Sequence, residues 1–172
     1  MSATGSSAGA TAPRGVSDAC DATTVGARFE FPIRVYWEDT DAGGIVFYAN
    51  YLKFFERGRT EWLRSLGIGQ QKLRDETGGM FVVSETTVKY HQPARLDDEL
   101  IVTAALTEAG RASLTIVQQV LSGGPEPRTV KADGMIRIGW VNVATLRPAR
   151  IPQQVLETLG RPNGQSTLRP HP

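Results

Sequence analysis

Two aspartates and two glycines stand directly before a helical pattern in this sequence. Asp39 and Asp41 are separated by one residue, and Gly43 and Gly44 follow them. A carboxylate can attack a carbonyl carbon or take a proton from water, and the free N–H groups at the start of a helix can hold the oxygen that becomes negative. The arrangement is therefore suited to chemistry on a carbonyl group.

The pattern alone leaves two roles for Asp41, which either carries the reaction or merely satisfies amides of the loop or the helix start. Asp39 is expected to hydrogen-bond the backbone of the turn. Gly43 and Gly44 allow a left-handed backbone and a close approach to a ligand. An oxyanion donor is expected among the amides of residues 46–48, which open the helix.

Regular structure is expected on both sides of the loop. Residues 48–66 have a helical period, with an apolar face formed by Tyr48, Tyr51, Leu52, Phe55, Trp62, Leu63 and Leu66. Apolar, β-branched and alternating runs predict strands at 31–37, 80–91, 100–107, 113–121 and 129–141, and a short final helix is expected at 151–159. Short turns favour an antiparallel sheet wrapped around the long helix, so the expected fold class is α+β.

A longer string around the loop resembles a known family signature. It runs from Arg34 to Val46 and continues with Asn50-Tyr51 and with Phe55 to Glu61. The string resembles the signature of hotdog-fold acyl-CoA thioesterases, in particular the 4-hydroxybenzoyl-CoA thioesterase type and the bacterial Tol–Pal-associated type. The similarity covers about residues 31–140, with further matching residues within 90–98.

The resemblance implies a long central helix wrapped by a five-stranded antiparallel sheet, and hydrolysis of an acyl- or aryl-CoA thioester. Asp41 matches the second aspartate of the family pattern, which implies that it is the catalytic nucleophile or general base. Tyr48 becomes the first choice for the oxyanion donor, with Gly43, Gly44 and Val46 beside it. Family members usually pair through a continuous sheet, so a homodimer or homotetramer is expected. Coenzyme A is then part of the substrate, and no cofactor is expected.

One position departs from the Tol–Pal-associated pattern. Those enzymes typically have a histidine where this chain has Tyr48, whereas the 4-hydroxybenzoyl-CoA type commonly has an aromatic residue there. The chain contains only two histidines, His91 and His171, and His91 is expected to make a structural hydrogen bond. The pattern therefore favours a thioesterase that works through its aspartate without an imidazole helper.

Several other polar residues are candidates for contact with the substrate. Arg59 either pairs with Glu56, three residues earlier, or contacts substrate or orders the loop. Tyr51 is a further candidate for substrate contact. The phosphates of coenzyme A require cations at the rim of the pocket, and the candidates near strand ends or turns are Lys89, Arg95, Arg111 and Arg128.

The composition narrows the remaining functions. A net charge of +1 gives no overall field for binding nucleic acid, and no apolar run of about eighteen residues predicts a membrane span. Cys20 is the only cysteine, so no disulfide can form within the chain and a cytoplasmic location is expected. No zinc-ligand spacing is present, so no metal site is expected. Residues 1–28 and 160–172 are expected to be tails around one domain at 29–159.

Two rival functions are consistent with the same fold. The first is an enoyl-CoA hydratase or dehydratase, whose chemistry usually needs a histidine beside the aspartate. The second is a non-catalytic module that binds acyl-CoA or acyl-carrier protein, and this carrier protein is also an alternative partner for the enzyme. The absence of a histidine near the loop counts against the first, and the Asp41 loop favours an enzyme over the second.

Overall fold

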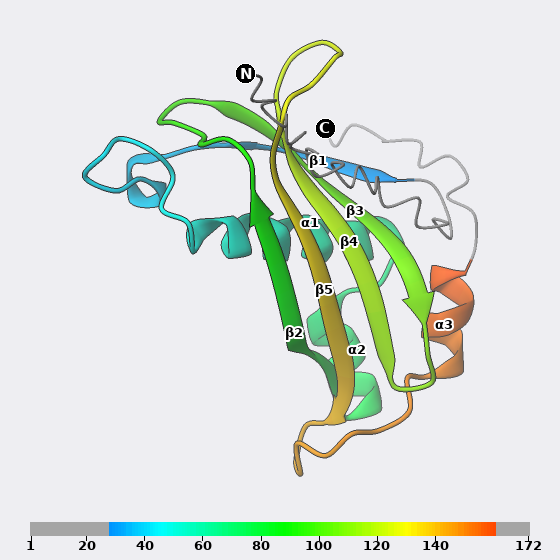
Figure 1. Ribbon diagram of the computed structural model, residues 1–172. Helices are drawn as coiled ribbons and strands as arrows, with labels where there is room; N and C mark the ends of the chain where they lie inside the picture. The colour runs from blue at the N-terminus through cyan, green and yellow to red at the C-terminus, as the bar shows by residue number, and fades with distance from the viewer. Residues whose placement is uncertain (1–27, 161–172) are drawn as a thin grey trace, which may run out of the picture.

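Five strands form one antiparallel sheet that curves around a long helix (Figure 1). The computed structural model describes residues 28–160. The strands are β1 (Phe29–Arg34), β2 (Gly79–Tyr90), β3 (Glu99–Ala109), β4 (Ser113–Ser122) and β5 (Val130–Asn142). Their order across the sheet is β1-β3-β4-β5-β2, and each neighbouring pair is antiparallel. The predicted α+β class and the sheet wrapped around a central helix are confirmed.

Three α-helices accompany the sheet: α1 (Asn50–Ser65), α2 (Gln70–Thr77) and α3 (Gln153–Leu159). The predictions of α1 and α3 are confirmed within a few residues. The sequence did not predict α2, because this helix has no buried residue and therefore no apolar stripe. None of the helices within 28–160 is long and apolar enough to span a membrane.

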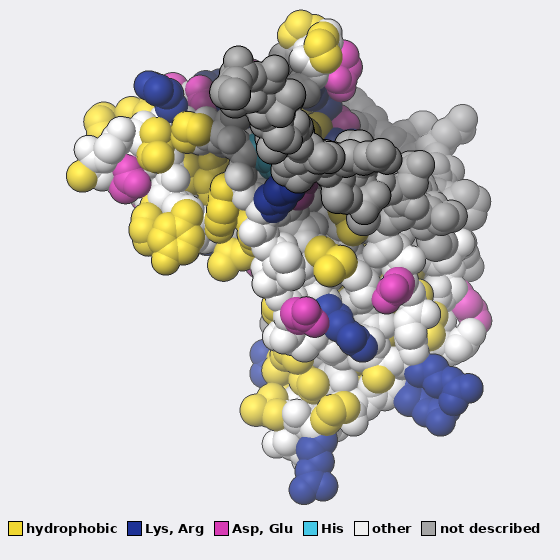
Figure 2. All heavy atoms as spheres, in the orientation of Figure 1, with side chains coloured by type: hydrophobic (Ala, Val, Ile, Leu, Met, Phe, Trp, Pro, Cys, Tyr) yellow, Lys and Arg dark blue, Asp and Glu magenta, His cyan; other side chains and the backbone are white. Residues whose placement is uncertain are grey.

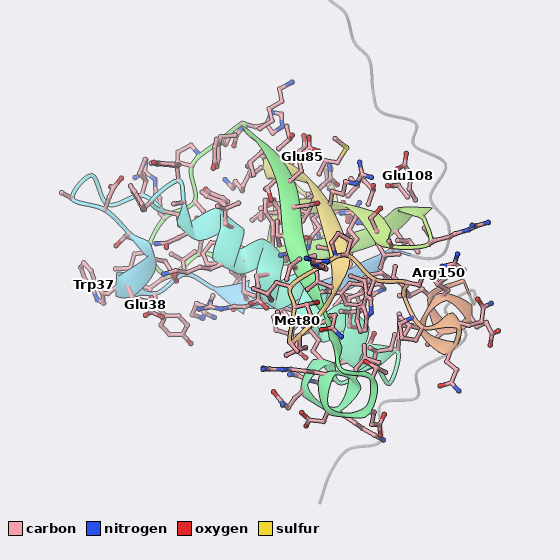
Figure 3. The ribbon with its side chains drawn as sticks, turned by 90° about the horizontal axis from the view of Figure 1, so that it is seen from below. Trp37, Glu38, Met80, Glu85, Glu108 and Arg150 are labelled. Carbon is pink, nitrogen blue, oxygen red and sulfur yellow. The ribbon has the colours of Figure 1, made fainter. Side chains whose placement is uncertain are left out.

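The first predicted strand is wrong at its C-terminal end. The strand stops at Arg34, and Trp37–Asp39 forms a 3-10 turn, η1, instead. The carboxylate of Asp39 accepts a hydrogen bond from the Tyr36 N–H, and the Asp39 N–H donates to the Tyr36 carbonyl. These two hydrogen bonds close the turn. Figure 3 shows Trp37 and Glu38 pointing outward from this turn.

The core lies between α1 and the concave face of the sheet. Phe54 and Phe55 of α1 are fully buried there. Gly58 allows close packing, because a Cβ at this position would lie 2.6 Å from Cγ1 of Val102 on β3. The predicted apolar face is wrong at Tyr48 and Leu52, whose exposed fractions are 63% and 43%.

These exposures follow from where the helix packs. Helix α1 packs mainly against β1, β3 and β4. The edge strand β2 is left partly open on its concave face, where Val83, opposite Ile138, is 52% exposed.

Tails were expected at 1–28 and 160–172. Except for residues 28 and 160 themselves, these segments lie outside the described residues.

Candidate active site

A tight loop between η1 and α1 carries Asp41. The Asp41 N–H donates to the carbonyl of Ile45 at 2.9 Å, and the Gly44 N–H donates to the carbonyl of Asp41 at 3.0 Å. Gly44 has a φ of 73°, a left-handed conformation that glycine adopts without strain. The loop thus closes on itself and holds Asp41 at an exposed position before the helix.

The carboxylate of Asp41 is held by its neighbour Gly43. Its Oδ1 accepts the Gly43 N–H at 2.8 Å. A Cβ at Gly43 would lie 3.1 Å from the same oxygen, so glycine is the residue that leaves room for this contact. The other oxygen, Oδ2, has no hydrogen-bond partner among residues 28–160, which leaves it available to a water or a substrate.

Asp39 hydrogen-bonds the backbone of the turn, as predicted. It is 1% exposed, and its Oδ2 accepts the Tyr36 N–H at 2.9 Å. Its carbonyl oxygen accepts both the Phe47 N–H and the side-chain amide of Asn50, each at 2.9 Å. Asn50 is the first residue of α1, so Asp39 fixes the chain between the loop and the helix.

The amides proposed as oxyanion donors differ in their availability. Those of Gly43 and Gly44 donate within the loop, and that of Val46 donates to the carbonyl of Ala94 at 2.8 Å. The N–H groups of Tyr48 and Ala49, by contrast, have no acceptor in the described part of the chain, and the start of α1 has no side-chain cap. Sequence reasoning missed Ala49, since only the hydrogen-bond pattern shows that its N–H is free.

A pocket of about 260 Å³ adjoins the start of α1. It is lined by Ile45, Val46, Tyr48, Tyr51, Tyr90, His91, Gln92 and Pro93. Hydrophobic side chains gather on the surface over the loop and the beginning of α1 (Figure 2). The pocket therefore offers an apolar, largely aromatic wall next to the free N–H groups.

Three tyrosines form that wall. The Tyr90 hydroxyl donates to the Tyr48 carbonyl, and the Tyr51 hydroxyl accepts the Ala94 N–H, both at 3.0 Å. Burial raises the pKa of the Tyr51 hydroxyl above its usual value, against a smaller opposing effect of the Ala94 N–H. The Tyr51 hydroxyl therefore keeps its proton at neutral pH.

Arg59 lies further along α1, away from the loop. Its guanidinium donates to Oε1 of Gln118 at 2.8 Å, and Gln118 is fully buried. The predicted ion pair with Glu56 is wrong, since Glu56 accepts the Thr60 hydroxyl instead. Burial lowers the pKa of Arg59, and the charge of Glu56 opposes this effect. Arg59 lines a second pocket, of about 160 Å³, together with Phe81 and Val83 of β2.

Three of the candidate cations for the coenzyme A phosphates differ in their partners and in their position relative to the Asp41 loop. Arg128 is engaged by Glu30 and Glu126. Arg111 lies in the β3–β4 turn, at the opposite end of the molecule from the loop (Figure 1). Arg95 lies beside the loop, because it forms an isolated β-bridge with Ile45.

His91 makes the structural hydrogen bond that the sequence suggested. Its Nε2 lies 2.6 Å from Oδ2 of Asp133, whose other oxygen accepts the side-chain amide of Gln119. His91 also contributes to the wall of the larger pocket, which its distance from the loop in the sequence did not indicate. No cluster of three or more metal-ligating side chains occurs between residues 28 and 160.

The chain is similar to known proteins over most of its described length. The model of the thioesterase-like superfamily matches residues 35–159. An acyl-CoA thioesterase YbgC from Haemophilus influenzae is 38% identical over 74% of this chain and 90% of its own length.

Solved structures share the same fold. A probable thioesterase from Bartonella henselae is 31% identical with a TM-score of 0.67, over 73% of this chain and all of that one. A 4-hydroxybenzoyl-CoA thioesterase variant in complex with 4-hydroxybenzoyl-CoA has a TM-score of 0.71 over 77% of this chain and 98% of its own. At 18% identity, this last likeness concerns the fold alone.

Proposed function

Because the chain belongs to the thioesterase-like superfamily, we propose that it hydrolyses an acyl-CoA thioester to a free acid and coenzyme A. The observation that carries this proposal is the segment from Asp41 to Ala49. It presents a carboxylate with one free oxygen and, at the adjoining start of α1, two backbone N–H groups without acceptors. An electrophilic carbonyl with a good leaving group is the substrate that such a pair suits.

The reaction follows from these two elements. The N–H of Tyr48, with that of Ala49, stabilises the negative charge that develops on the thioester oxygen. Asp41 either takes a proton from the attacking water or attacks the carbonyl carbon itself. In the second case, the carbon–sulfur bond breaks to give an acyl anhydride on Asp41 and coenzyme A thiolate, and water then hydrolyses the anhydride. The thiolate takes up a proton as it leaves.

The aromatic wall of the pocket supports a hydrophobic acyl group. Tyr48, Tyr51 and Tyr90 offer flat apolar surfaces that accept either an aryl ring or an aliphatic chain. The proposal includes coenzyme A as the usual carrier, with acyl-carrier protein as the alternative partner. A cytoplasmic location is also part of it, supported by the single cysteine of the sequence.

A homodimer, or a homotetramer built from it, is the proposed assembly. Strand β2 lies at the edge of the sheet, and its concave face is only partly covered, with Val83 exposed. A long edge strand of this kind is suited to pairing with a second copy. Sedimentation velocity tests the proposal, and a monomer at micromolar concentration would overturn it.

The activity is tested by the release of coenzyme A, measured with a thiol reagent over short, medium, long and aryl acyl-CoAs. The wild-type protein is compared with Asp41→Asn, which keeps the shape but removes the charge. Asp75→Asn on the exposed helix α2 is the matched control. We expect turnover to be lost in Asp41→Asn alone. Full activity of a folded Asp41→Asn protein would refute the mechanism, and a wild type inert on every substrate would favour a binding module.

A further inference from the structure

Tyr90 is the last residue of β2, and it reaches across to the start of α1. Its hydroxyl donates a 3.0 Å hydrogen bond to the carbonyl oxygen of Tyr48, a residue 42 positions earlier in the chain. Its ring meets those of Tyr48 and Tyr51 edge-on, with centroid distances of 6.4 and 5.5 Å. The edge strand is thus tied to the beginning of the helix by one hydrogen bond and by ring packing.

The carbonyl that Tyr90 holds belongs to the peptide group whose N–H is that of Ala49. This N–H and the N–H of Tyr48 are two of the donors at the helix start that have no acceptor within the described residues. A hydrogen bond to the carbonyl oxygen fixes the orientation of the peptide plane, and it polarises the N–H at the other end. Tyr90 therefore acts on this peptide group through its carbonyl oxygen, without itself occupying the place of the substrate carbonyl.

The same peptide segment is restrained from its other side. The Phe47 N–H and the Asn50 side chain both donate to the Asp39 carbonyl. These contacts hold the residues on either side of Tyr48 and Ala49, whereas the Tyr90 contact holds the carbonyl between the two residues. Polar contacts from the turn before the helix and from β2 therefore restrain the segment that carries the N–H groups of Tyr48 and Ala49.

We propose that Tyr90 is a positioning residue, whose hydroxyl orients the Tyr48–Ala49 peptide so that the free N–H of Ala49, beside that of Tyr48, meets the thioester oxygen. The inference rests on the thioesterase function proposed above and assigns a further residue to it. Burial raises the pKa of the Tyr90 hydroxyl above its ordinary value, so the hydroxyl keeps its proton and donates throughout the neutral range.

The first test is Tyr90→Phe, which removes the hydroxyl and keeps the ring. We expect kcat to fall about tenfold or more while KM changes less than about twofold, because the lost restraint matters for the charge that develops in the transition state. The melting temperature should stay near that of the wild type. Tyr36→Phe is the matched control, since Tyr36 is 59% exposed and its hydroxyl has no hydrogen-bond partner within residues 28–160.

A second variant separates orientation from simple packing. Site-specific 3-fluorotyrosine at position 90 keeps the ring and makes the hydroxyl a stronger donor, so kcat should remain at or above the wild-type value at about pH 7. A Tyr90→Phe protein with a kcat within about twofold of the wild type would overturn the inference. A kcat that falls in the fluorinated variant as it does in Tyr90→Phe would also overturn the inference. If the wild type releases no coenzyme A from any substrate, the thioesterase proposal fails, and the role of Tyr90 fails with it.

Discussion

The backbone of Gly43 lies against the carboxylate of Asp41, and a side chain on Gly43 would crowd this carboxylate. The Gly43 N–H donates to Oδ1 of Asp41 at 2.8 Å, and a Cβ on Gly43 would approach this oxygen to 3.1 Å. The position of the carboxylate therefore depends on the absence of a side chain two residues further along. Under the proposed mechanism, this loop glycine therefore has a role in the chemistry as well as in the turn.

We expect Gly43→Ala to lower kcat by roughly three- to tenfold, because the added methyl group displaces the carboxylate by a few tenths of an ångström. The unfolding temperature should change little, since the residue is exposed and does not need a left-handed backbone. Gly69→Ala is the control, because its Cβ would come no closer than 3.8 Å to another side chain. Equal kcat values for the two variants would show that the carboxylate tolerates the displacement.

Arg95→Ala should raise KM for acyl-CoA by roughly fivefold, the equivalent of about 1 kcal/mol, because Arg95 is the candidate phosphate contact that lies beside the loop. Arg111→Ala, at the far turn, should leave KM unchanged. The corresponding acyl-pantetheine substrate lacks the nucleotide, so its KM should not respond to Arg95→Ala. A response with both substrates would place Arg95 at the acyl end of the site or in its structure.

Arg59 and Gln118 should be coupled in stability. Gln118 is fully buried, and its side-chain amide donates to the carbonyls of Phe55 and Thr103 while its oxygen accepts from Arg59. We expect Gln118→Met to lower the free energy of unfolding by about 2 kcal/mol, because buried polar groups lose their partner. Urea unfolding of the single variants and of Arg59→Met/Gln118→Met should show a coupling of about 1 kcal/mol. Additive effects would mean that the contact does not stabilise the fold.

Gly58→Ala should destabilise the protein although alanine favours helices. A Cβ at this position would overlap Cγ1 of fully buried Val102, and overpacking costs about 1–3 kcal/mol, more than the gain in helix propensity of at most about 1 kcal/mol. The test is urea unfolding in two backgrounds. Gly58→Ala should be far better tolerated when Val102 is also alanine, and a stabilising effect in the wild-type background would contradict the packing described here.

The features predictable from the sequence were those that repeat along it. Alternation located β3 and β4, and the helical period located α1, because burial on one face imposes these periods directly. The Asp41 loop was found through its residue types and its resemblance to a family signature. Helix α2 has no buried face, so it left no periodic trace in the sequence.

What the sequence could not supply were contacts between distant segments. The partner of Arg59 is Gln118, from β4, rather than its helical neighbour Glu56. The bond from Tyr90 to Tyr48 depends on how β2 ends against the start of α1. Such contacts are fixed by the register of the sheet and the placement of the helix on it, neither of which has a local pattern.

If the proposed dimer forms along β2, it would link the proposed chemistry to protein concentration, because β2 also carries Tyr90. Contacts that a second copy makes with β2 would exist only while the two copies are associated, so their population would follow mass action. Dilution would then lower the specific activity without any inhibitor being bound. The amount of the protein present would set the activity of each molecule as well as the number of molecules.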